Sequence, residues 1–79
     1  MRKEVETLNV SIVARNTRRI IQERGLKQNR VAERANIPPK LFSSLLCGRK
    51  IIRDTDVIAI ANALGVTPNE LFRREEPPV

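Results

Sequence analysis

The feature that most constrains the fold of this chain is the spacing of the residues that start and end helices between positions 25 and 48. Gly25 and Gly48 are good helix stops, Asn36 readily adopts the left-handed backbone conformation, and Pro39 suits a first helical position. Together they predict a helix over 28–35, a tight turn, and a helix that starts at Pro39 and ends at Gly48. Small proteins present one helix to the DNA major groove with this layout.

Apolar spacing predicts which faces of these two helices turn inward. The buried sides are Val31, Ala32 and Ala35 in the first, and Phe42, Leu45 and Leu46 in the second. The opposite face of the second helix carries Lys40, Ser43, Ser44 and Cys47.

A further helix is predicted over about 10–24, with Asn9 as its N-cap and Gly25 as its stop. Its inward face is Val10, Val13, Ala14, Thr17, Ile20 and Ile21. Residues 8–12 also alternate as in a strand, but helix is favoured because the helical spacing continues for about four turns.

Two more helices are predicted after Gly48. One covers about 55–64, with Asp54 as N-cap, Gly65 as stop, and Val57, Ile58, Ala61 and Leu64 buried. The other begins with the capping box of residues 67–70, and its Leu71 and Phe72 are expected to pack on the core. Ile60, or Leu71 and Phe72, could instead form a dimer interface.

The sequence therefore predicts an all-α fold, a compact five-helix domain over residues 10–74. A short N-terminal arm, 1–9, would precede the domain, and a flexible tail, 75–79, would follow it.

Positive charge is concentrated on the segment that holds the two central helices. The whole chain has a net charge of +6. Residues 15–53 alone carry eleven Lys and Arg against two Glu, a net charge of +9. Such a segment suits a phosphate backbone. The alternative is an ordinary soluble surface with a basic bias.

The composition offers little for catalysis. The chain has no His, a single cysteine, Cys47, and no glycine-rich phosphate loop, so we expect no enzyme activity, no metal and no cofactor. No small-molecule ligand is evident. A single cysteine excludes an internal disulfide. No apolar run is long enough to cross a membrane, and no signal peptide is apparent. A cytoplasmic protein without a membrane span is therefore expected.

The order and spacing of several motifs resemble the phage repressor/Cro-type helix-turn-helix family, often called XRE-like, over about residues 10–73. The motifs are Gly25-Leu26-Lys27-Gln28, Val31-Ala32, Asn36-Ile37, Phe42, Gly48-Arg49-Lys50, Ile60-Ala61, Ala63-Leu64-Gly65-Val66-Thr67 and Glu70-Leu71-Phe72. The resemblance implies a repressor-type helix-turn-helix domain. It implies a sequence-specific DNA-binding transcriptional regulator, a repressor that binds double-stranded DNA at a two-fold operator as a homodimer through its third helix.

The resemblance also implies which residues face DNA. Gln28 matches a phosphate-contacting position, and Arg49 and Lys50 match backbone clamps. Base-facing positions hold Pro39, Lys40, Ser43 and Ser44, and Cys47 stands where the family often has a polar residue near phosphate. Leu41 could touch a thymine methyl or be partly buried. For the polar residues, the alternative is a plain solvated surface. Oxidant sensing by Cys47 is a further alternative.

Two departures from the family pattern bear on function. The family usually pairs a partly buried Arg with a Glu where this chain has Ile21 and Leu46, so both partners are apolar together and are expected to touch. Pro38 and Pro39 replace polar residues at the start of the third helix, which leaves base reading to Lys40, Ser43 and Ser44. The alternative function is therefore a protein-interaction module: an antitoxin, an anti-repressor or a partner-dependent co-regulator. Exposure of Leu41 or Ile60 would favour it.

Overall fold

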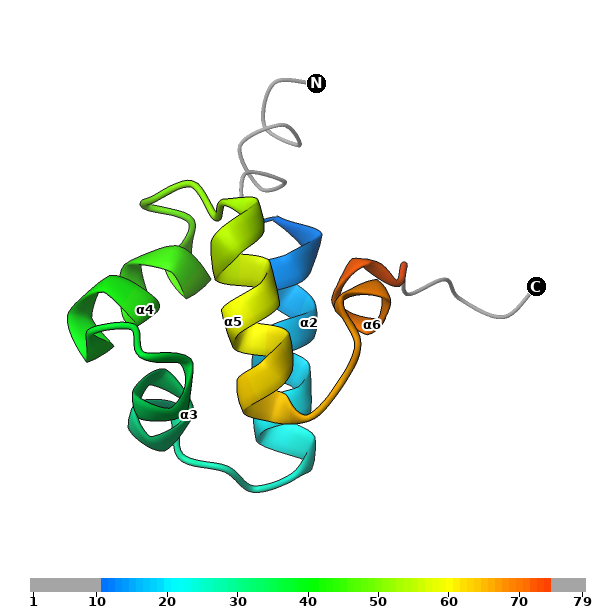
Figure 1. Ribbon diagram of the computed structural model, residues 1–79, viewed down its shortest axis with the longest axis horizontal. Helices are drawn as coiled ribbons and strands as arrows, with labels where there is room; N and C mark the ends of the chain where they lie inside the picture. Colours follow the sequence, from blue (N-terminus) through cyan, green and yellow to red (C-terminus); the bar gives the residue numbers. More distant parts are fainter. Residues whose placement is uncertain (1–10, 75–79) are drawn as a thin grey trace.

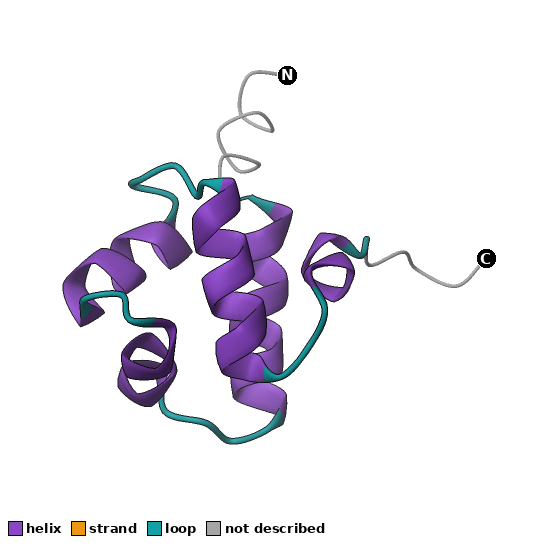
Figure 2. Cartoon of the chain, viewed as in Figure 1, coloured by secondary structure: helices purple, strands orange, loops and turns teal. Residues whose placement is uncertain are grey.

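The computed structural model describes residues 11–74, which form five helices and no strand (Figures 1 and 2). The helices are α2 (Ile12–Glu23), α3 (Gln28–Ala35), α4 (Pro39–Cys47), α5 (Asp54–Leu64) and α6 (Pro68–Phe72). The all-α fold predicted from the sequence is confirmed. The N-terminal arm, Asn9, Val10 and the tail at 75–79 lie outside the described residues.

The helices pack around one core, with α3 and α4 on one side of α5 and α6 on the other (Figure 1). Helix α2 packs on α4 and α6, while α3 packs on α4 and α5. The largest fully buried side chains are Phe42, Ile60, Leu71 and Thr17, which come from four different helices. Helix α4 is held by its buried inner face against α2 and α3.

Four helices end in the same way, with one residue in the left-handed conformation. Gly25, Asn36, Gly48 and Gly65 have φ of 64°, 62°, 83° and 72°. In each case the next residue donates its N–H to a carbonyl five positions back, at 2.9 Å: Leu26 to Ile21, Ile37 to Ala32, Arg49 to Ser44 and Val66 to Ala61. This is the Schellman motif, which satisfies carbonyls at a helix end and turns the chain sharply. The four predicted helix stops are confirmed.

Two helix starts differ from the prediction, and a third lacks the capping hydrogen bond that was expected. Helix α2 begins at Ile12 and not near position 10, because Ser11 Oγ accepts the Ala14 N–H at 3.1 Å. Helix α5 begins one residue early, with Asp54 already inside it; Asp56 accepts the N–H of Arg53, the N-cap residue, at 3.0 Å. Thr67 is the N-cap of α6, as expected, but its side chain makes no capping hydrogen bond.

Two predictions of burial were wrong, because both residues lie at the margin of an apolar face. Ile58 and Phe72 are each 53% exposed, since the inner faces of α5 and α6 are completed by other side chains. Ile60 and Leu71 are fully buried, which excludes them from a dimer interface. Leu41 is half-buried and packs against the core, as one of its two readings anticipated.

Asn16 is a buried polar residue that the apolar pattern did not select. It is 2% exposed, and its Nδ2 donates to the carbonyls of Leu71 at 2.7 Å and Arg73 at 2.8 Å. Its Oδ1 accepts from Arg19 at 3.2 Å. These bonds satisfy the buried amide and fasten the end of the short helix α6 to α2.

Arg24 has a comparable role at the opposite end of α2. Its guanidinium donates to the carbonyl of Leu64 at 2.7 Å, a group at the C-terminus of α5. A cation is favoured there because helix C-terminal carbonyls carry partial negative charge. Part of the basic charge of segment 15–53 therefore serves the fold.

We predict that Asn16→Ala lowers the free energy of unfolding by about 2–3 kcal/mol, because it leaves two carbonyls without their donor. Urea unfolding followed by circular dichroism measures the change. Arg15→Ala, an exposed neighbour on the same helix, is the control and should change stability by less than about 0.5 kcal/mol. A loss of that small size for Asn16→Ala would show that the amide does not hold α6.

The apolar pair Ile21 and Leu46 gives a second prediction. Both are buried in the core, on helices that pack together. Leu46→Glu alone should destabilise by about 3–5 kcal/mol, because it buries an unpaired charge. Adding Ile21→Arg should recover at least about 1 kcal/mol if the two side chains meet. If the double variant loses as much free energy of unfolding as the two single variants together, these positions do not face each other.

Candidate nucleic-acid interface

Helix α4 presents its polar face outward because its apolar face is anchored. Phe42, Leu45 and Leu46 recur at helical spacing and are buried. Lys40 on the other face is exposed, while Ser43 and Ser44 are half-buried. Lys40 is therefore the long polar side chain of α4 that extends into solvent. The two serines add short hydroxyl groups on the same face.

The start of α4 is rigid and lacks side-chain caps. Pro38 is the N-cap with φ of −56°, and Pro39 is the first helical residue; both are exposed. Pro39 has no N–H, so the first turn offers an approaching anion fewer donors than usual. The carbonyl of Pro38 accepts the N–H of Phe42 at 2.9 Å, which begins the helix.

The end of α4 places two cations beside it. Gly48 adopts φ of 83°, and the Arg49 N–H bonds to the carbonyl of Ser44. At the other three Schellman ends the residue after the left-handed one is apolar (Leu26, Ile37 or Val66), but here it is Arg49. Arg49 and Lys50 are both exposed and have no ion pair within residues 11–74. Their charges are thus free for an external anion.

The α4–α5 connection contains two residues that sequence reasoning did not select. Ile51 follows the two cations and is 85% exposed, while Ile52 packs against the core. Lys50, Ile51 and Ile52 line a depression of about 200 Å³ together with Ser11, Leu45 and Gly48. Arg53 is exposed at the N-cap of α5 and adds a third cation to this connection. Ile51 is distinguished from a core residue by its exposed fraction alone. No sequence pattern indicated this exposure.

Gln28 is exposed at the first position of α3. The N-cap residue, Lys27, makes no side-chain hydrogen bond to the helix. The first N–H groups of α3 therefore have no side-chain cap, and such N–H groups attract anions.

Cys47 is an exposed free thiol at the last position of α4. The structure brings it onto the same helix as Lys40, Ser43 and Ser44, with Arg49 and Lys50 just beyond. Gln28 comes from α3, which packs on α4. All eight residues expected to face DNA lie at surfaces that are at least partly open to solvent.

Two further features are absent from residues 11–74. In this range, no group of His, Cys, Asp and Glu could hold a metal ion. No helix within the same range is long and apolar enough to cross a membrane.

The comparison with known families agrees with this geometry. A family model described as a helix-turn-helix domain matches residues 14–73, which include all five helices except the first two residues of α2. No curated protein and no solved structure matches the chain. The family match is consistent with the XRE-like resemblance seen in the motifs, and the chain therefore belongs to the helix-turn-helix domain family.

Proposed function

We propose that this protein is a sequence-specific DNA-binding transcriptional regulator whose helix α4 enters the major groove. One observation carries the proposal: α4 has an exposed polar face, and both α3, which packs on α4, and the segment after α4 carry groups that attract phosphate. These groups are the N–H groups of α3 at Gln28, which no side chain caps, and the cations Arg49 and Lys50, which form no ion pair within residues 11–74. In the helix-turn-helix arrangement, the second helix reads bases while backbone contacts flank it.

Each residue has a distinct role in this proposal. Lys40 donates to a guanine edge, and Ser43 and Ser44 make permissive contacts that discriminate weakly. Pro39 positions the start of α4 in the major groove of the DNA. Cys47 approaches the DNA backbone near the end of α4. Gln28, Arg49 and Lys50 bind phosphates and set the register of the helix on the duplex.

We further propose that the protein acts as a cytoplasmic homodimer that represses by occupying a two-fold operator. Half-sites would then lie roughly 34 Å apart, one helical turn of DNA. The exposed Ile58 and Phe72 support a dimer, because they lie on α5 and α6, which pack against each other and carry no proposed DNA contact. The domain would span residues 10–74, with the arm and tail outside it.

The interaction-module alternative lacks the exposed apolar residues that would have favoured it. Exposed Leu41 or Ile60 would have favoured that function, but Leu41 is half-buried and Ile60 fully buried. DNA binding by the isolated chain separates the two functions.

The direct test is fluorescence anisotropy of the purified chain with two duplexes, the DNA upstream of its own gene and a scrambled sequence. Binding should prefer the upstream duplex over the scrambled one. It should also weaken steeply as salt rises, because Lys and Arg displace counterions from phosphates. No binding to either duplex at low salt, or a salt-independent curve, would overturn the proposal.

Two single substitutions distinguish base reading from phosphate binding. Lys40→Ala should weaken specific binding by about 1–3 kcal/mol and non-specific binding much less. Arg49→Ala should weaken both and lower the salt slope by about one unit. Arg15→Ala is the control, since Arg15 is exposed on α2. Equal effects of the two substitutions on both duplexes would contradict the assigned roles.

A further inference from the structure

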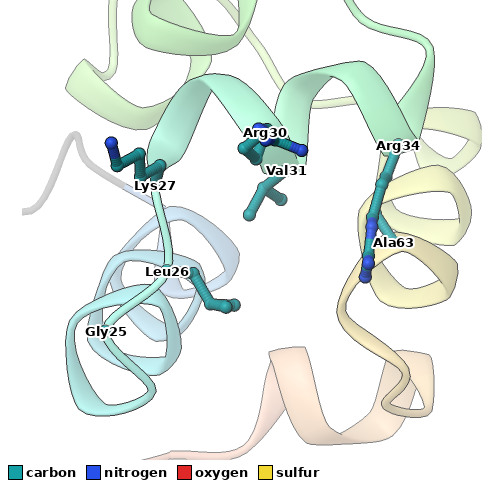
Figure 3. Close-up of a pocket in the computed structure, with 7 residues that line it drawn as sticks. All are labelled: Gly25, Leu26, Lys27, Arg30, Val31, Arg34 and Ala63. Carbon is teal, nitrogen blue, oxygen red and sulfur yellow. The ribbon is translucent and has the colours of Figure 1, made fainter.

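A second basic surface lies on α3, beginning at Lys27, the residue before Gln28, and continuing along the helix to Arg34. It is a groove of about 350 Å³ lined by Gly25, Leu26, Lys27, Arg30, Val31, Arg34 and Ala63. Figure 3 shows Val31 and Leu26 pointing into the space between α3 and the preceding loop, with Arg34 extending beside Ala63 of α5. The floor is thus apolar and the rim is basic.

The three rim cations have no counter-charge among residues 11–74. Lys27, Arg30 and Arg34 are exposed, and none forms an ion pair or a side-chain hydrogen bond within residues 11–74. They are spaced by three and four residues, which places them along one side of α3. Arg30 and Arg34 are like charges four positions apart, an arrangement that destabilises a helix slightly unless an anion lies between them.

The apolar floor is also incompletely covered. Leu26 is 40% exposed although it follows the left-handed Gly25, at a position where an apolar side chain normally packs on the helix it ends. Val31 and Ala63 are buried at the base of the groove. A ligand that only neutralised the cations would leave the exposed part of Leu26 in water.

The groove adjoins the proposed DNA contact at one end, because Lys27 directly precedes Gln28, and extends away from it along α3 to Arg34. None of its lining residues belongs to α4 or to the α4–α5 connection. In Figure 3 the groove opens on the side of α3 away from α4. A duplex seated on α4 and Gln28 would therefore leave accessible the end of the groove at Arg34 and Ala63.

We infer that this groove is a docking site for an acidic segment of a partner protein that also carries an apolar anchor residue. Its carboxylates would pair with Arg30 and Arg34, and its apolar side chain would cover Leu26 over the floor at Val31 and Ala63. Charge complementarity selects an acidic partner. The apolar floor favours a peptide over a phosphate backbone, which has no apolar side chain to place there. The inference adds to the proposed function, because the regulator could hold DNA and a partner at once.

The test uses the whole chain and a fluorescein-labelled 16-residue peptide of repeated Glu-Glu-Leu-Leu, a probe with both features of the partner. Anisotropy should show binding, and a peptide with Gln in place of every Glu should bind at least about 10-fold more weakly. Arg30→Glu combined with Arg34→Glu should weaken binding of the acidic peptide about 10-fold. Arg15→Glu combined with Arg18→Glu changes the net charge equally on exposed positions of α2 and should weaken it about 2-fold or less.

Amide shifts of the ¹⁵N-labelled wild-type chain give a readout that needs no variant. Addition of the peptide should move the amides of Leu26, Arg30, Val31 and Ala63 and leave those of Lys40 and Ser43 in place. Shifts centred on α4 would overturn the proposal, as would equal losses from the two charge-reversal pairs.

A DNA titration of the same variants separates this inference from the proposed function. The Arg30 and Arg34 pair should weaken DNA binding no more than the Arg15 and Arg18 pair does. If it weakens DNA binding more and leaves peptide binding unchanged, the groove is a DNA-backbone site and the inference is wrong. Failure of the peptide to bind also overturns it, whatever the chain does with DNA.

Discussion

The left-handed residue at the end of each of the helices α2 to α5 is the constraint on which the rest of the structure depends. Helices of eight to twelve residues bury enough surface only if the chain turns back at once and packs them together. Gly25, Asn36, Gly48 and Gly65 make those turns and satisfy the carbonyls that each helix end would otherwise expose. The orientation of α4, and therefore the site, follows from the turns at Asn36 and Gly48.

The motif that ends α4 also differs from the other three in its charge. Arg49 occupies the place that holds an apolar residue at the other three ends, so the turn that stops the helix also presents a cation next to it. The structural and electrostatic roles of one short segment are thereby coupled. Arg24 shows the converse, because its charge is used to bond the carbonyl of Leu64 and to join α2 to α5. A net charge of +9 over residues 15–53 is therefore not a measure of the charge available to a ligand.

Helix α3 has a different environment on each side. Gln28, its first residue, belongs to the proposed DNA contact, while Lys27, Arg30 and Arg34 border the groove that includes Ala63 of α5. One eight-residue helix can carry both surfaces because its buried residues, Val31, Ala32 and Ala35, hold it against α4 and α5. Small alanines allow that close packing.

Much of the fold, and the exposure of the residues proposed for the site, could be predicted from the sequence. Helix periods and left-handed stops are local properties, so α3 and α4 were bounded correctly and their inner faces named. The exposed Lys40, Arg49 and Lys50 could be placed for the same reason. Ile58 and Phe72 could not, because an apolar residue at the margin of a face is buried only if another helix happens to cover it.

What the sequence by itself determined is the set of helices, the turns between them and the polar face of α4, since each depends on neighbours a few residues apart. Only the tertiary structure decided which polar groups serve the core and which remain free. Asn16 bonds the carbonyls of Leu71 and Arg73, more than fifty positions away, and Arg24 bonds Leu64 forty positions away. The groove likewise exists only because Ala63 of α5 is brought beside Leu26 and Val31. Packing brings together residues from distant parts of the chain, and no local pattern encodes those distances.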